Sequence, residues 1–402
     1  MMNLSAGYPY WLIKTGLPYT YPKLDKSVSS EVVIIGGGIS GSLMAYYLAQ
    51  EGIDSILVDS RTIGLGSTSA STALLQYEID VPLHKLSEII GKKKATRSYN
   101  LCLESINIIA SIAEKLNFHE FEYKKSLYYA CFKRDIPYIQ NEYTARKRNG
   151  FNVQFLDSVD IKKNYNFKSP LAILSKDGAQ LNPYSFTHAL LQYCITKATR
   201  VFDRTLISKI EHKKEYVHLE TEDGHKIKTR HLIYANGYEV VKYIDKKIVD
   251  LHSTYAIVSE QFNYDVKFWK DNAMIWNTAD PYLYIRTTLD GRILIGGRDE
   301  PFYNPGKRDK LIKTKAQQLK LDFQRLFPHI PFKTELSWTG TFGATQDGLP
   351  FIGPYKNLPN SYFALGFGGN GICFSVIAAE IIRDIITGKK NKDLDIFSFD
   401  RI

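Results

Sequence analysis

The chain of 402 residues is 44% hydrophobic and 23% charged, with a formal net charge of +10 at pH 7. This composition is ordinary for a soluble globular protein, and the length suffices for two or three domains. Lysines occur in scattered pairs and triplets without an arginine-rich arm, so no nucleic-acid binding is expected. The four cysteines form no C-x-x-C pair and the nine histidines no ligand-spaced cluster, which predicts reduced thiols, a cytoplasmic location and no metal site.

The first chemical signature is "EVVIIGGGISG", residues 31–41. The β-branched run predicts a parallel strand that is buried on both faces. Gly36, Gly38 and Gly41 match G-x-G-x-x-G and precede the helical stretch "LMAYYLAQEG". Gly36 permits a tight turn, Gly38 lets backbone amides approach a pyrophosphate, and Gly41 allows close packing of helix on strand. The segment therefore predicts a dinucleotide whose phosphates lie at a helix amino terminus.

A second predicted strand, "DSILVD", ends at Asp59. An acid at this distance from the glycines binds a ribose hydroxyl pair and disfavours a 2′-phosphate. The Ser/Thr-rich stretch "GLGSTSASTALLQYE", residues 64–78, follows shortly after. Such a run can be a flexible linker, but its place beyond the carboxyl end of this strand favours a polar lip around a ligand.

The middle of the chain shows further helical and strand patterns but no catalytic dyad. Two uncharged stretches, 32–50 and 361–379, reach membrane-spanning length, yet glycine clusters interrupt both, so no integral membrane span is expected.

Helices are predicted over 82–116, 135–150, 181–198 and 308–327, and strands over 126–132, within 200–234 and within 251–300.

A predicted hairpin at Asp290-Gly291 places Tyr282, Tyr284 and Arg286 on one strand face. These side chains could form a solvated surface or the wall of a pocket for a carboxylate-bearing or planar substrate. The pattern alone leaves both interpretations open.

Near the carboxyl terminus, a strand at 361–365 leads into the glycine-rich turn "GFGGNG", residues 366–371, and a long helix that ends near Gly388. The helix amino terminus favours negative charge, such as that of a reduced flavin ring. A simple tight turn between two core elements is the alternative.

Several blocks occur in an order that resembles the D-amino-acid-oxidase-like family of FAD-dependent oxidoreductases. They are "VVIIGGGISG…ILVD", "GLGSTSAS", "LIYANG", "DGRILIGG", "DGLPFIGP" and "GFGGNGI". This family includes glycine oxidases, sarcosine oxidases and γ-glutamylputrescine oxidases, and the resemblance covers nearly the whole chain.

The resemblance implies an α/β fold with two lobes. A Rossmann-like FAD-binding domain, built on a parallel sheet and a β-meander, is expected from residues 28–90, 177–240 and 338–402. An α+β substrate domain with an antiparallel sheet is expected from 91–176 and 241–337, and 1–27 would form an amino-terminal extension.

By the same resemblance, the glycine loop and Asp59 hold the pyrophosphate and ribose, and the Ser/Thr run meets the pyrophosphate and the flavin ring. Ile207 contacts the adenine through its backbone, and the glycine turn closes on the pyrimidine end of the ring. The residues expected to contact FAD are Gly36, Gly38, Ile39, Ser40, Asp59, Ser60, Arg61, Gly66, Ser67, Thr68, Thr72, Ala73, Leu74, Ile207, Ala235, Gly237, Gly343, Asp347, Gly366, Gly368, Gly369, Asn370, Gly371 and Ile372.

The chain departs from its relatives where some of them tether FAD covalently. Ala70 stands where a tethering histidine occurs, and Gly340–Gly343 where sarcosine oxidases carry a cysteine. FAD is therefore expected to bind non-covalently. Leu294 replaces the lysine with which sarcosine oxidases activate oxygen, which leaves molecular oxygen or another electron acceptor open.

The reaction implied by the resemblance is hydride transfer to FAD from the C–H next to an amine nitrogen of a small amine or amino acid, giving an imine. Arg286, Tyr284 and Tyr255 are the expected catalytic or anchoring residues, and Gln76 and Tyr282 line the pocket. Two alternatives are an FAD-dependent 2-hydroxy-acid dehydrogenase with a non-oxygen acceptor and a non-catalytic flavin-binding subunit. The oligomeric state is not indicated.

Overall fold

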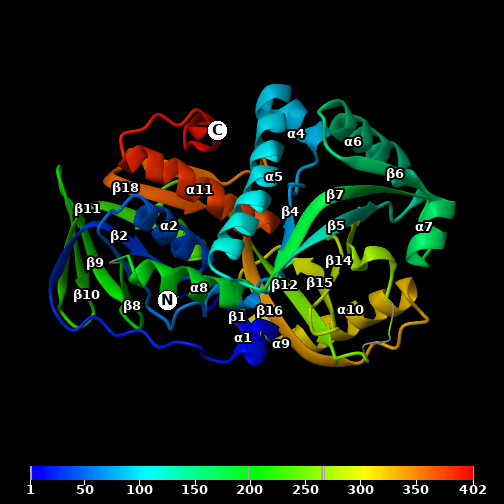
Figure 1. Ribbon diagram of the computed structural model, residues 1–402, viewed down its shortest axis with the longest axis horizontal. Helices are drawn as coiled ribbons and strands as arrows, with labels where there is room; N and C mark the ends of the chain where they lie inside the picture. Colours follow the sequence, from blue (N-terminus) through cyan, green and yellow to red (C-terminus); the bar gives the residue numbers. More distant parts are fainter. Residues whose placement is uncertain (1, 198, 264–265, 267, 402) are drawn as a thin grey trace.

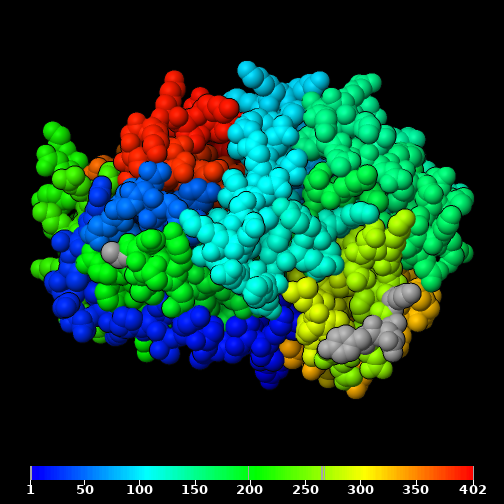
Figure 2. Space-filling model, viewed as in Figure 1, coloured from blue at the N-terminus to red at the C-terminus, as the bar shows by residue number. Residues whose placement is uncertain are grey.

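The computed structural model describes residues 2–197, 199–263, 266 and 268–401. Two sheets lie side by side, and α5 (Lys92–Lys115) runs between them in Figure 1. This helix packs against α11 of one half and against β4 and β7 of the other. In the space-filling view, the same cyan helix covers the junction of the two halves (Figure 2). The arrangement agrees with the α/β class expected from the sequence.

The first sheet, here called the parallel sheet, follows the order β17-β18-β11-β2-β3-β8. Its core is the run Val32, Val33 and Ile34, which is fully buried because helices and the meander cover both faces. Its parallel members are β2 (Val28–Ile35), β3 (Ser55–Val58), β8 (Arg200–Phe202), β11 (Lys226–Tyr234) and β18 (Leu358–Leu365). At one edge, β17 (Phe351–Tyr355) pairs antiparallel with β18. The meander of β9 (Ile207–His212) and β10 (Val217–Thr221) lies beside β11, with which β10 pairs antiparallel.

The parallel pairing of β2 and β3 requires a crossover, which α2 (Ile39–Gln50) provides. This helix packs between α8 (Pro183–Ile195) and α11 (Gly371–Ile386). Both α2 and α11 begin at the carboxyl ends of strands, so their amino termini point toward the same edge of the sheet.

The second sheet, here called the mixed sheet, follows the order β1-β16-β12-β15-β14-β13-β5-β7-β4, with β6 beside β7. One face packs on α10 (Ile312–Leu326), and the other faces the parallel sheet. The strands are β1 (Ser5–Gly7), β4 (Leu74–Gln76), β5 (Phe121–Tyr129), β6 (Val153–Asp157), β7 (Leu171–Leu181), β12 (Asp250–Ser259), β13 (Met274–Asn277), β14 (Tyr284–Thr287), β15 (Ile293–Glu300) and β16 (Thr334–Ala344).

Two predicted helices are each divided in the structure. The stretch 82–116 forms α4 (Leu83–Ile90) and α5, because Gly91 between them adopts a φ of 84° that interrupts helical geometry. The stretch 308–327 forms the end of α9 (Pro305–Lys310) and then α10. The remaining helical segments are α1 (Tyr10–Thr15), α3 (Ser67–Ala70), α6 (Ile136–Arg148), α7 (Ser158–Tyr165), α12 (Leu394–Phe397), η1 (Lys133–Asp135), η2 (Gly237–Tyr243), η3 (Lys270–Asn272) and η4 (Gly368–Asn370).

Sheet membership differs from the expected domain boundaries at three places. Residues 74–76, 177–181 and 338–344 pair within the mixed sheet, although the sequence placed them with the FAD-binding segments. The amino-terminal extension joins the same sheet, since β1 pairs with β16. The division into two domains remains a proposal.

No helix in the described ranges combines the length and the apolar character needed to cross a membrane. All four cysteines are free thiols.

Candidate active site

A large cavity lies between the carboxyl ends of the parallel sheet and the inner face of the mixed sheet. We call the part lined by residues 35–40, 59–61, 205–207 and 235–243 the nucleotide end. The part lined by residues 76–80, by strands β12 to β15 and by the turn 367–372 is called the sheet end. The Ser/Thr run, residues 66–74, lies between the two ends and is called the cradle.

The glycine loop at the nucleotide end leaves no space for side chains. Gly36 has a φ of 116°, and a Cβ there would lie 2.4 Å from the Ala235 carbonyl oxygen. A Cβ on Gly41 would lie 1.8 Å from the Gly36 carbonyl oxygen. Gly38, the residue before α2, has no side chain that could cap the free N–H groups of this helix. The helix amino terminus therefore remains available to an anion.

Asp59 is fixed at the carboxyl end of β3 by two backbone donors. The Gly37 N–H donates to Oδ2 at 2.6 Å, and the Arg61 N–H donates to Oδ1 at 2.7 Å. Burial raises the pKa of this carboxyl. Each oxygen keeps a lone pair for a further donor, such as a ribose hydroxyl.

The cradle is a fixed segment, because side chains from distant parts of the chain hold its backbone. The Trp11 Nε1–H donates to the Ser71 carbonyl at 2.6 Å, and the Trp338 Nε1–H donates to the Ala70 carbonyl at 2.9 Å. Thr68 accepts at Oγ1 from the Ile39 N–H at 3.0 Å, which joins the cradle to the first turn of α2.

Arg286 supports the cradle and does not reach the cavity. Its Nη1 donates to the carbonyl oxygens of Thr72, Ala73 and Leu181 at 3.0, 2.8 and 3.2 Å. The guanidinium lies over the Trp11 ring, is 2% exposed, and burial lowers its pKa to about 9. This position favours a role for Arg286 in supporting the pocket, and an anchoring role toward the substrate stays a prediction.

Tyr255 also has a structural position. Its ring packs into the core with residues of α10, and its hydroxyl donates to the Arg308 carbonyl at 3.4 Å, although the residue also borders the cavity. The Tyr284 hydroxyl, in contrast, lies 3.3 Å from Thr254 Oγ1 in the sheet end. The hydroxyl of Tyr255 is therefore used within the protein, whereas that of Tyr284 is positioned to meet a ligand.

Asp80 connects two segments of the sheet end by hydrogen bonds. It accepts from the Tyr282 hydroxyl at 3.2 Å and from the Gly369 N–H at 2.8 Å. A Cβ on Gly368 or Gly369 would lie 2.4 or 2.7 Å from an Asp80 carboxylate oxygen. The glycine-rich turn therefore makes room for this carboxylate. Trp276, which stacks on Tyr128 with ring centroids 3.8 Å apart, completes the aromatic wall.

Asp299 is a second carboxylate in the sheet end. Its Oδ1 is buried and accepts no hydrogen bond from the described part of the chain. Burial raises its pKa to about 7, and the charge of Asp80 contributes to this rise. The sequence did not indicate either acid, because neither belongs to a recognisable motif.

A β-bulge explains why strand periodicity conceals Asp299. The pairing of β12 with β15 shifts register between Ser253 and Tyr255, and Arg298 has a φ of 60°. Strict alternation would place Asp299 on the α10 side with Ile295, but the extra residue turns it toward Thr254 and the cavity.

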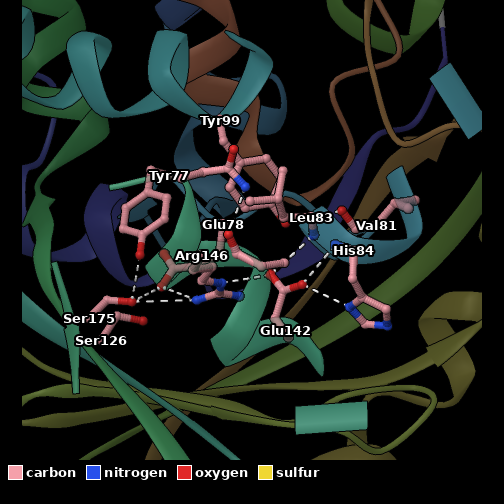
Figure 3. A network of polar contacts seen from close by, with 12 residues as sticks. Tyr77, Glu78, Val81, Leu83, His84, Tyr99, Ser126, Glu142, Arg146 and Ser175 are labelled. Atoms are coloured by element: carbon pink, nitrogen blue, oxygen red, sulfur yellow. Dashed lines mark hydrogen bonds and ion pairs between the residues drawn. The ribbon is translucent and has the colours of Figure 1, made fainter. Parts of the chain in front are cut away.

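Glu78 lines the cavity beside Asp80 and belongs to the buried network of Figure 3. Arg146 contacts Glu78 Oε1 at 3.1 Å and Glu142 Oε1 at 2.6 Å, so one guanidinium serves two carboxylates. Burial opposes ionisation of Glu142, yet Arg146 and hydrogen bonds from His84 lower its pKa to about 2. Burial raises the pKa of Glu78 despite Arg146.

The nucleotide end and the cradle fit FAD. Ser67 Oγ and Asn236 Oδ1 are buried there without a hydrogen-bond partner in the described chain, as expected where a polar cofactor supplies the partners. A Cβ on Gly340 would lie 3.6 Å from the Ala70 Cβ, so both expected tether positions face each other and carry no reactive group. The described lining contains neither histidine nor cysteine.

Four of the expected site residues lie outside the lining that the structure describes. Besides Arg286, they are Gly343, Asp347 and Gly366. The Asp347 carboxylate pairs with Arg401 at 2.9 Å and is 2% exposed. The expected site residues that do lie in the described lining are Gly36, Gly38, Ile39, Ser40, Asp59, Ser60, Arg61, Gly66, Ser67, Thr68, Thr72, Ala73, Leu74, Gln76, Ile207, Ala235, Gly237, Tyr255, Tyr282, Tyr284, Gly368, Gly369, Asn370, Gly371 and Ile372.

Gln76 reaches the sheet end and donates from Nε2 to Ser126 Oγ at 2.8 Å. Leu294, which stands for the oxygen-activating lysine, is fully buried in the core. Across the ranges that the structure describes, no three His, Cys, Asp or Glu side chains are grouped as metal ligands.

Comparison with known proteins agrees with this site. A model of the "FAD dependent oxidoreductase" family matches residues 31–385. The chain is 24% identical to the glycine oxidase of Bacillus subtilis over 403 residues, which cover 92% of this chain and 97% of that protein. It is 21% identical to the gamma-glutamylputrescine oxidoreductase of Escherichia coli, covering 92% of this chain and 86% of that protein. The crystal structure of L-proline dehydrogenase from P. horikoshii superposes with a TM-score of 0.78 at 18% identity, over 93% of this chain and 97% of that chain.

Proposed function

The chain belongs to the family of FAD-dependent oxidoreductases, and we propose that it oxidises the C–H bond next to the nitrogen of an amine or amino acid. The carbon loses a hydride, the nitrogen loses a proton, and the resulting imine is hydrolysed by water to a carbonyl compound and an amine or ammonia. When bound, FAD supplies the acceptor for the hydride and passes the two electrons to molecular oxygen or another acceptor. Binding of FAD is non-covalent in this proposal.

The observation that carries the proposal is the charge of the sheet end. Asp80 and Asp299 line it, whereas the basic residues of the described lining, Arg61 and Lys242, belong to the nucleotide end. Carboxylates attract an ammonium ion and repel the carboxylate of a 2-hydroxy acid. The charge therefore favours an amine over the hydroxy-acid alternative.

The sheet end also offers the groups that amine oxidation needs. An ammonium ion must lose a proton before its carbon can give up a hydride, and a carboxylate with a pKa near 7 suits that transfer at neutral pH. Asp299 has this pKa. Tyr282, Tyr284 and Trp276 provide an aromatic wall that holds the carbon skeleton and excludes water.

The test is anaerobic reduction of the purified flavoprotein by a panel of amines, amino acids and 2-hydroxy acids. We expect bleaching of the flavin band by at least one amine or amino acid and by no hydroxy acid. Bleaching by a hydroxy acid alone would favour the dehydrogenase alternative. A flavin that dithionite reduces but no substrate does would favour the non-catalytic subunit. Admission of air to the reduced protein then tests whether oxygen is the acceptor.

A further inference from the structure

The sheet end contains one carboxylate more than the reaction of a single amine requires. One acid can hold the reacting nitrogen and take its proton, and Asp299 is suited to that task. The reaction of a single amine then assigns no role to Asp80. Its side chain is exposed to the cavity, although it already accepts from Tyr282 and Gly369.

A second acid lies beside Asp80 and accepts few hydrogen bonds. Glu78, two residues before it, lines the same cavity and is only 3% exposed. Its Oε2 is buried and receives no hydrogen bond within the described chain. Arg146 is shared between Glu78 and Glu142, so this guanidinium is held by two carboxylates behind the sheet end and is not available to a ligand there (Figure 3).

An anionic group of a substrate would meet no cationic side chain in the described lining of the sheet end. Arg286, the cation nearest in sequence to the tyrosine wall, donates from Nη1 to three backbone carbonyls of the cradle and β7 and is not part of the described lining. Lys315, whose charge acts on Asp299, pairs with Glu300 at 2.5 Å and is not part of the described lining. A free carboxylate would be desolvated beside Asp80 without compensation.

We propose that the substrate carries a second cationic nitrogen and no carboxylate, and that Asp80 binds this second nitrogen. The inference rests on the proposed function and narrows its substrate class to diamines and related polycations. The hydroxyls of Tyr282, which donates to Asp80 at 3.2 Å, and of Tyr284, 3.3 Å from Thr254 Oγ1, line the same part of the cavity and would offer further polar contacts to such a substrate.

Three compounds that differ only in the group at the fourth carbon test the proposal: 1,4-diaminobutane, butylamine and 4-aminobutanoate. Each is titrated anaerobically into the FAD-loaded protein, and Kd is taken from the perturbation of the flavin absorption band. We expect the diamine to bind about tenfold or more tightly than butylamine, as for a hydrogen bond between charged groups. The carboxylate should bind most weakly of the three.

Asp80→Asn tests the assigned residue, since the amide is isosteric with the carboxylate. The ratio of the butylamine Kd to the diamine Kd should fall about tenfold, toward one. The control is Glu88→Gln, which removes an acid that is 65% exposed on α4 and should leave the ratio unchanged. The flavin content of each variant shows that the cavity is intact.

The proposal is overturned if butylamine or 4-aminobutanoate binds as tightly as the diamine, or if Asp80→Asn leaves the ratio at its wild-type value. Should some amine reduce the flavin while this order of affinities fails, the proposed function stands and only the second-cation site is lost. Should the order hold while no amine reduces the flavin, the recognition site stands and the proposed oxidation fails.

Discussion

At the scale of single residues, Asp59 joins the glycine loop to the nucleotide end through the hydrogen bonds from Gly37 and Arg61. Asp59→Ala removes the expected acceptor of the ribose hydroxyls and one anchor of the loop. We expect the Kd of FAD to rise about ten- to hundredfold. Fluorescence titration of the apoprotein measures it. Asp54→Asn, at the opposite end of β3 and 52% exposed, is the matched control, and an equal effect of both would contradict the assignment.

Because the pKa of Asp299 is raised, we expect amine binding to depend on pH. Burial, together with Asp80 and Asp280, raises this pKa to about 7 although Thr254 and Lys315 act in the opposite direction. An acid is charged above its pKa, so the sheet end loses a negative charge as the pH falls through about 7. A diamine stays protonated there because its ordinary pKa is about 10.

The Kd of 1,4-diaminobutane should therefore rise as the pH is lowered from about 8.5 to about 5.5. In Asp299→Asn this dependence should be much weaker, with a Kd close to the wild-type value at low pH. A pH profile that is unchanged in the variant would exclude Asp299 as the titrating group.

At the scale of elements, the cradle depends on Arg286. Arg286→Met leaves three buried carbonyl oxygens without their donor. The expected loss of unfolding free energy is about 2–4 kcal/mol, measured by urea denaturation of the apoprotein. FAD affinity should fall as well, because the cradle backbone is released. A substrate-anchoring role would instead raise Kd for the amine with unchanged stability.

A further prediction concerns the effect of a Gly368 substitution, in the glycine-rich turn between β18 and α11, on diamine binding. In Gly368→Ala the new Cβ would lie 2.4 Å from an Asp80 oxygen, at a φ of 53°. Gly388→Ala is matched in backbone strain, with a φ of 71°, but meets nothing within 4 Å. Both should destabilise the fold similarly, by about 1 kcal/mol. Gly368→Ala alone should weaken diamine binding, and an equal effect on binding in both variants would contradict the role of Asp80.

Segments could be predicted from the sequence where their role depends on residues that are close to them along the chain. The glycine loop, Asp59 and the cradle were predicted because each occupies a fixed place after a buried strand. Asp299 was missed because a bulge at Arg298 changes the face on which it lies. The strand pattern predicted that Arg286 and Tyr284 share a face, but it could not show the hydrogen bonds of Arg286 to the cradle carbonyls, because these lie about 200 residues away in sequence.

At the scale of the whole molecule, the cavity is formed where two sheets meet, and its lining comes from many segments of the chain. The fold class was predictable from the motifs, but the acidic character of the sheet end was not, because it arises from 76–80 and β15, which are distant in sequence. The pairing of β4, of the end of β7 and of β16 within the mixed sheet was hidden for the same reason.

A cofactor that contacts both halves should stabilise the folded state. With free FAD at about a hundred times its Kd, the free energy of unfolding should exceed that of the apoprotein by about 2.7 kcal/mol. Urea denaturation of the two forms, with adenosine monophosphate as a control ligand for the nucleotide end alone, measures the difference. Equal stabilities of the FAD-loaded and apo forms would contradict a site between the sheets.

The most direct measurement is reconstitution of the purified chain with FAD, followed by acid precipitation and quantification of the flavin in the supernatant. The predicted result is a yellow protein with one FAD per chain, all of it released by acid, because neither histidine nor cysteine lines the described cavity. A colourless protein that takes up no FAD would contradict the assignment of the cavity, and flavin that stays in the precipitate would contradict non-covalent binding.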